Sequence, residues 1–213
     1  TLARTLGARH GVEVFAPQFP GYRDEAGLAH RVHRFPSWIW PPQPRYPLAI
    51  PASAELGRHF AGAAFDVVHT HSPFALGQTG RRWARRHGIP VVTTYHTLYV
   101  EYAHYAQVLP AGVVRRYLQQ LSRAYCNAVD AVVVPTDPIR EVLRGYGVST
   151  PIEVIPTGLD LRPPVPPCAE FPRGRFGIPP EVPLVLYAGR LVKEKNLPLL
   201  FQAFARVRST PSA

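Results

Sequence analysis

Short apolar runs and helical stripes of apolar residues alternate along the first 160 residues of the chain. Runs rich in Val, Ile and Phe that are bounded by Gly, Pro or polar residues are typical of strands. Six such runs are Val12–Ala16, Arg31–Phe35, Phe65–Thr70, Pro90–Thr94, Ala131–Pro135 and Ile152–Pro156. Helical patterns at Ala52–Ala63, Ala75–His87, Ala111–Ala128 and Asp137–Tyr146 separate most of them. This alternation predicts an α/β fold whose parallel sheet is covered by helices on both faces.

The helical pattern at Ala111–Ala128 is the clearest. Its apolar stripe, which we expect to pack against the sheet, consists of Val114, Tyr117, Leu118, Leu121 and Tyr125. Arg and Gln residues occupy the opposite face, as is usual for a helix with one side in water.

The last part of the chain repeats the pattern of strand, loop and helix. An apolar run from Leu184 stops at Gly189, a charged loop follows, and one helical face then carries Leu197, Leu200, Phe201, Phe204 and Val207. The preceding stretch, 161–180, contains seven prolines, which predict an irregular, stiff connection. We therefore predict a first domain at 1–160, a linker at 161–180 and the start of a second domain at 181–213.

The charged loop after Gly189 contains two candidate anion ligands. Arg190 offers a planar fork that suits two phosphate oxygens, and Lys195 is a compact charge that can approach the same group. The only two lysines of the chain, Lys193 and Lys195, both lie in this loop, whereas the other basic residues are arginines. On spacing alone, a solvated charged loop remains the alternative to an anion site.

Composition limits the kinds of partner that the chain can bind and indicates whether the chain is complete. A formal charge of +10 favours anionic partners: phosphates, acidic lipid headgroups or nucleic acid. No apolar run approaches the roughly 20 residues that span a bilayer. Two cysteines indicate neither a disulfide framework nor a metal site, and they favour a reducing compartment. The chain has no Met, starts with the end of a helical pattern and stops just after another, so we expect a fragment truncated at both ends.

Four segments carry a family resemblance. DVVHTHSPF (66–74), VVTTYHTLYVEYAHY (91–105), PIEVIPTGLDL (151–161) and AGRLVKEKN (188–196) together resemble retaining, nucleotide-sugar-dependent glycosyltransferases of family 4, which have the GT-B fold. The second segment is similar to members that glycosylate diacylglycerol. The resemblance implies a Rossmann-like first domain that lacks its first strand, followed by the opening β–α unit of a second Rossmann-like domain.

The same resemblance implies roles for individual residues. His96, Arg190 and Lys195 would be catalytic, and the last two would bind the donor diphosphate. The remaining implied site residues are His71, Glu101, Tyr102, His104 and Tyr105 beside the acceptor, and Thr157, Gly158 and Asp160 in a turn at the cleft. The family's glycine-rich loop and its pair of glutamates are not in this sequence, so we expect the fragment alone to be inactive.

The implied reaction transfers a hexose from a UDP-sugar to a hydroxyl acceptor, with retention of configuration and with a membrane lipid such as diacylglycerol as the expected acceptor. The resemblance implies no cofactor and no essential metal. The expected location is cytoplasmic, peripheral at the inner face of the membrane. Amphipathic aromatics in the predicted loop Phe35–Pro51 and four arginines between Arg81 and Arg86 are consistent with an anionic membrane surface, and a solvated helix face is the alternative for the arginines.

Alternatives remain for several of these features. His96 can be a structural histidine, and His69 can be part of the packing or of a hydrogen-bonding network. A metal bound by His69 and His71 is disfavoured, because no carboxylate or Cys lies at a suitable spacing. The absence of RNA-binding aromatic motifs and zinc-finger spacing argues against nucleic acid. A phosphosugar or nucleotide-sugar isomerase-type enzyme, or a non-catalytic peripheral membrane-binding module, also fits parts of the pattern.

Overall fold

A computed structural model describes residues 2–24, 27, 30–39, 47–105, 110–158, 170–192 and 195–209. The chain divides into two compact units, unit 1 from Thr1 to Asp160 and unit 2 from Leu161 to Ala213. Each unit is a separate body with its own elements.

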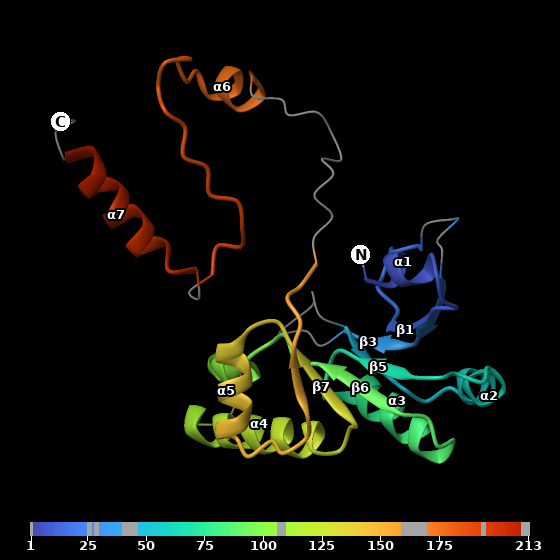
Figure 1. Ribbon diagram of the computed structural model, residues 1–213. Coiled ribbons are helices and arrows are strands. Elements are labelled where there is room, and N and C mark those ends of the chain that lie inside the picture. The colour runs from blue at the N-terminus through green and yellow to red at the C-terminus, as the bar shows by residue number, and fades with distance from the viewer. Residues whose placement is uncertain are drawn as a thin grey trace. The chain divides into compact units, whose positions relative to one another are not determined.

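Unit 1 is built on a four-stranded parallel sheet whose spatial order follows the chain (Figure 1). Its strands are β5 (Val68–Thr70), β6 (Val91–Thr94), β7 (Ala131–Val134) and β8 (Ile152–Val154). The crossovers contain α3 (Ala75–Arg86), then the 3-10 helix η1 (Tyr99–Tyr105) with α4 (Ala111–Cys126), and finally α5 (Asp137–Gly145). Figure 1 shows α3 and α4 along one side of this sheet. The arrangement confirms the predicted α/β class with a parallel sheet, although β5 and β8 are shorter than predicted.

The first residues of unit 1 form a second parallel pair. Helix α1 (Leu2–Gly7) leads to β1 (Glu13–Pro17), which pairs with β2 (Arg31–Phe35) so that Phe15 lies opposite His33. Helix α2 (Ala54–Gly62) follows, and its N-cap residue Ser53 accepts a hydrogen bond from the backbone N–H of Leu56 at 3.2 Å. These elements confirm the predicted strands and helix of this region.

The segment predicted as a loop at Phe35–Pro51 contains two short strands. β3 (Ser37–Trp38) and β4 (Leu48–Ala49) pair antiparallel, and the backbone N–H of Ile50 donates to the carbonyl of Pro36 at 2.7 Å. The prolines prevented this prediction, but none of them occupies a residue of the paired stretches. The intervening residues 40–46, with Trp40, Arg45 and Tyr46, lie outside the described residues.

Helix α4 packs on the sheet through only half of its length. Ser122, Tyr125 and Cys126 are buried, whereas Tyr117, predicted to lie in the buried stripe, is 64% exposed. The reason is length: sixteen helical residues extend about 24 Å, while four strand residues cover about 13 Å. The first half of the helix therefore reaches beyond the strands.

Unit 2 contains α6 (Glu170–Phe176) and α7 (Leu197–Ser209). Helix α7 confirms the predicted helix, but the predicted strand from Leu184 is wrong. Residues 183–188 have no ladder partner among the residues that the structure describes, and Val185 and Leu186 are 68% and 76% exposed. An apolar run becomes a strand only when another strand accepts its backbone hydrogen bonds.

Helix α6 lies inside the proline-rich stretch that we predicted to be irregular throughout. Pro172 falls in its first turn, where the backbone N–H has no helical partner to lose, so this proline is compatible with a helix. Within the described ranges, no helix is both long enough and apolar enough to cross a bilayer.

Candidate functional site

Two histidines meet at the carboxyl ends of neighbouring strands in unit 1. His71 directly follows β5, and His96 is the second residue after β6, which pairs with β5 in parallel. Their rings stack, with centroids 5.4 Å apart and planes inclined by 22°. The ring of His69 also contacts that of His71, with centroids 4.4 Å apart. The structure thus brings together the predicted catalytic histidine and a predicted acceptor-side histidine.

Buried neighbours position both histidines through helix α4. Thr70, 6% exposed, accepts a hydrogen bond at 2.8 Å from the hydroxyl of Tyr125. Tyr95, 3% exposed, shares a hydrogen bond of 2.9 Å with the hydroxyl of Ser122. Successive residues of an extended chain point to opposite sides, so fixing Thr70 and Tyr95 inward directs the residue after each of them outward.

Sequence reasoning missed this anchoring role of α4. Tyr125 was included only as one member of an apolar stripe, and no pattern distinguished Ser122 from any other polar residue on a helix. A buried hydroxyl next to a site residue is visible only after the helix has been placed on the sheet.

His71, the central ring of the histidine cluster, is uncharged at neutral pH. Desolvation by the surrounding atoms, together with His69 and His96 nearby, lowers the pKa of His71 from 6.5 to about 4, although the residue keeps an exposed face. Desolvation and then His96 also lower the pKa of His69, whose Nε2 lies 2.7 Å from the hydroxyl oxygen of Thr94. A neutral imidazole exchanges hydrogen bonds with hydroxyl groups, which suits a sugar or an alcohol better than an anion.

Helix η1 follows His96 closely in the sequence and contains part of the predicted acceptor segment. Val100 and Ala103 are buried, and η1 packs against α4, while Glu101 and Tyr102 remain exposed. The Glu101 carboxylate pairs with the guanidinium of Arg115 at 3.5 Å. The side chains of His104 and Tyr105 lie outside the described part of the structure.

The predicted turn after β8 lies at the same edge of the sheet but two strands away from β6. Thr157 and Gly158 are exposed. A Cβ added at Gly158 would meet nothing within 4 Å, so space does not require a glycine there. Asp160 lies outside the described residues.

Arg190 and Lys195 are five positions apart in unit 2, and both are exposed. The hydroxyl of Tyr187 donates to the carbonyl of Arg190 at 3.0 Å, and the N–H of Val192 donates to the same carbonyl at 3.1 Å. The N–H of Lys195 donates to the carbonyl of Val192 at 3.0 Å. That both cations grip one diphosphate remains a prediction.

Comparison with known proteins adds a family model and curated relatives. The model described as Glycosyltransferase Family 4 matches residues 1–162. The chain is 35% identical over 156 residues to the alpha-monoglucosyldiacylglycerol synthase of Streptococcus pneumoniae, covering 67% of this chain and 33% of that protein. It is 30% identical over 200 residues to the GDP-mannose-dependent alpha-mannosyltransferase of Mycolicibacterium smegmatis, covering 92% of this chain and 52% of that protein.

A solved structure agrees on the fold. Sucrose-phosphate synthase from Thermosynechococcus elongatus superposes with a TM-score of 0.67 over 97% of this chain and 52% of that one, at 22% identity. The chain thus spans between a third and about half of the length of these relatives.

Proposed function

Because this chain belongs to glycosyltransferase family 4, we propose that it forms part of an enzyme that moves a hexose from a UDP-sugar to a membrane lipid such as diacylglycerol, with retention of configuration. The observation that carries the proposal is the stacked pair of His71 and His96 at the carboxyl ends of β5 and β6. Ligands of open α/β sheets bind at this edge, where loops and strand ends converge.

The residues of the pair would have different tasks. His96 would hydrogen-bond a hydroxyl of the donor sugar, and neutral His71, with Glu101 and Tyr102 on η1, would border the acceptor. A neutral ring suits the position of His71, because a cation there would have to be desolvated when the sugar excludes water.

Arg190 and Lys195 would stabilise the departing diphosphate. If each contributes a charge-assisted hydrogen bond of about 1.5 to 3 kcal/mol mainly in the transition state, the pair accelerates transfer roughly a hundred- to ten-thousandfold. The mechanism needs no metal, because positive charge from the protein neutralises the leaving group.

The acceptor proposal is supported by one relative and by the surface of unit 1. The streptococcal relative is named for the synthesis of a glucosyldiacylglycerol. Trp38, Ile39, Leu48 and Ile50 are each at least 37% exposed on and beside the β3–β4 pair, and β4 contacts the arginine-bearing helix α3. An exposed Trp with neighbouring aliphatic side chains beside basic residues suits an anionic bilayer surface.

A specific observation favours a second donor. The match to the GDP-mannose-dependent enzyme spans 200 residues and therefore includes part of unit 2, whereas the match to the diacylglycerol enzyme covers 156 residues. Both candidate donors contain a diphosphate, so Arg190 and Lys195 would serve either one.

The test is sugar transfer by the protein in its full natural length. UDP-glucose, UDP-galactose and GDP-mannose, each radiolabelled, are offered with diacylglycerol in vesicles, and label is counted in the lipid phase. We expect transfer from a UDP-sugar. Transfer from GDP-mannose alone would establish the second donor, and transfer from none of them to any hydroxyl acceptor would refute the proposal.

Variants of the loop test the diphosphate role. Arg190→Ala and Lys195→Ala should each lower kcat/KM at least tenfold, because each removes a charge from the leaving group. Lys193→Ala is the matched control, since it removes the same charge two positions away and should change the rate little. Equal effects of Lys193→Ala and Lys195→Ala would show that only the overall charge of the loop matters.

A further inference from the structure

A second cluster of titratable side chains lies where β1, β2 and α2 meet. Glu13 begins β1, His33 is the central residue of β2, and His59 lies in α2. The Nε2 atom of His33 is 2.7 Å from Oε2 of Glu13, and Nε2 of His59 is 2.5 Å from the same oxygen. One donor atom from each residue lies within 4.8 Å of the other two, and the described residues contain no other such set of three.

We propose that Glu13, His33 and His59 bind one divalent transition-metal ion, and that Zn²⁺ is the ion that their donor atoms fit best. Two imidazoles and one carboxylate are usual zinc ligands, at about 2.0–2.1 Å for nitrogen and 2.0–2.2 Å for oxygen. Donors around such an ion lie roughly 3.3 Å apart, so the two ring nitrogens would each withdraw from Glu13 by less than about 1 Å. Each ring would bind the metal as the neutral tautomer that carries its proton on Nδ1, so that the lone pair of Nε2 is available to the metal.

Packing holds the two rings near the positions that a metal requires. The ring of His33 stacks on Phe15, with centroids 4.8 Å apart and planes inclined by 20°. The rings of His33 and His59 lie 4.4 Å apart, and Phe15 also contacts Phe60 of α2 at 6.1 Å. An apolar shell that fixes the ligands before binding reduces the entropy that binding must overcome.

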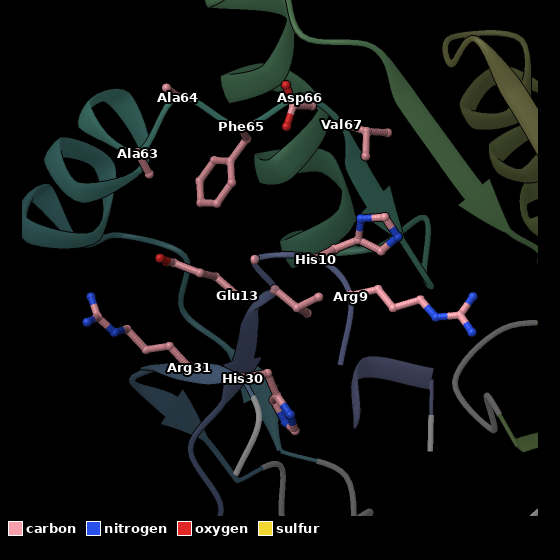
Figure 2. A pocket seen from close by; sticks show the side chains of 12 residues that line it. Arg9, His10, Glu13, His30, Arg31, Ala63, Ala64, Phe65, Asp66 and Val67 are labelled. Atoms are coloured by element: carbon pink, nitrogen blue, oxygen red, sulfur yellow. The ribbon is translucent and has the colours of Figure 1, made fainter. Parts of the chain in front are cut away.

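The cluster is partly open to solvent, which gives an ion a way in. The side chains of Glu13, His33 and His59 are 21%, 13% and 30% exposed. Glu13 also lines an open pocket of about 1090 Å³, and Figure 2 shows its side chain leaving β1 on the side of α2. The guanidinium of Arg9 lies on the opposite side of that pocket from the carboxylate of Glu13. Water can complete the coordination at the open positions.

This site differs from the histidine pair at the strand ends. Glu13 lies at the amino end of β1. The three ligands of the proposed site are residues 13, 33 and 59, so a bound ion would connect two strands and a helix. The simpler alternative is a hydrogen-bonded bridge in which Glu13 accepts from both rings without a metal. The two cases differ in what added zinc does.

The experiment uses the whole 213-residue chain, freed of metal with a chelator. Zinc binding is measured by isothermal titration, Co²⁺ is used as a spectroscopic probe, and Tm is recorded with and without Zn²⁺. The variants are Glu13→Gln and His33→Gln, which keep size and polarity. His10→Gln is the control, because His10 lines the same pocket but does not belong to the cluster.

We expect one equivalent of Zn²⁺ to bind and Tm to rise by about 5 to 10 °C when zinc exceeds Kd a hundredfold. Glu13→Gln and His33→Gln should weaken binding more than about 100-fold, since even the partners of metal ligands contribute roughly 10- to 100-fold. His10→Gln should bind as the unmodified chain does.

Three results would overturn the proposal: no binding by the unmodified chain, unchanged affinity in Glu13→Gln and His33→Gln, or an equal loss in His10→Gln. If the two variants do not fold, the unmodified chain decides. Titration with Zn²⁺ should then shift the ring NMR signals of His33 and His59, and signals that stay in place would exclude them as ligands.

Discussion

Replacing Gly77 by Ala should destabilise the fold at the point where it positions the histidine pair. Gly77 is the third residue of α3, and a Cβ there would lie 1.7 Å from the carbonyl oxygen of Ser72, half of an ordinary 3.4 Å contact. The same Cβ would lie 2.9 Å from the hydroxyl of Tyr125. The carbonyl belongs to the backbone and cannot rotate away, so the residue next to His71 has to move.

The magnitude follows from two opposing effects. Overpacking costs about 1 to 3 kcal/mol, and more where backbone must shift, while Ala gains at most about 1 kcal/mol over Gly in a helix. We expect a net loss of about 2 kcal/mol. For a chain of this size, that loss corresponds to a decrease in Tm of roughly 4 to 8 °C.

The assay is thermal unfolding followed by circular dichroism, with Gly80→Ala as the matched control. Gly80 lies in the same helix, and a Cβ there would make ordinary contacts of 3.6 Å with Val68 and 3.7 Å with Thr70. Gly80→Ala should therefore leave Tm unchanged or raise it. Equal Tm values for the two variants would refute the idea that close approach at Gly77 fixes the turn after β5.

Two further predictions concern the anchoring and charge of the same site. Tyr125→Phe removes the buried hydrogen bond to Thr70 and should lower the free energy of unfolding by about 1 kcal/mol; an unchanged urea midpoint would contradict the anchoring role. His71 should remain neutral down to about pH 5, because its pKa in the folded state is about 4 instead of 6.5. Since the unfolded chain binds that proton first, the stability that His71 contributes is lost as pH falls from 6.5 toward 4; a ring that titrates near pH 6.5 by NMR would contradict this.

Local patterns were sufficient for most of unit 1. Residues that face the core are apolar, because burial of apolar surface drives folding. Strands and helices therefore leave different apolar patterns in the sequence, and these patterns indicated the strands and the α/β class. Three of the four motifs behind the family resemblance lie at the ends of β5, β6 and β8, and the matching family model agrees with the resemblance. The extended run from Leu184 was predicted as a strand because apolarity was visible and the required partner was not.

The tertiary structure decided which side chains meet. His71 and His96 are 25 residues apart in the sequence, and only the parallel pairing of β5 with β6 stacks their rings. Glu13, His33 and His59 are likewise brought together by β1, β2 and α2 across 46 residues. A period along the chain shows which face a residue occupies, but not which distant residue lies beside it, because that depends on strand order, register and the placement of helices on the sheet.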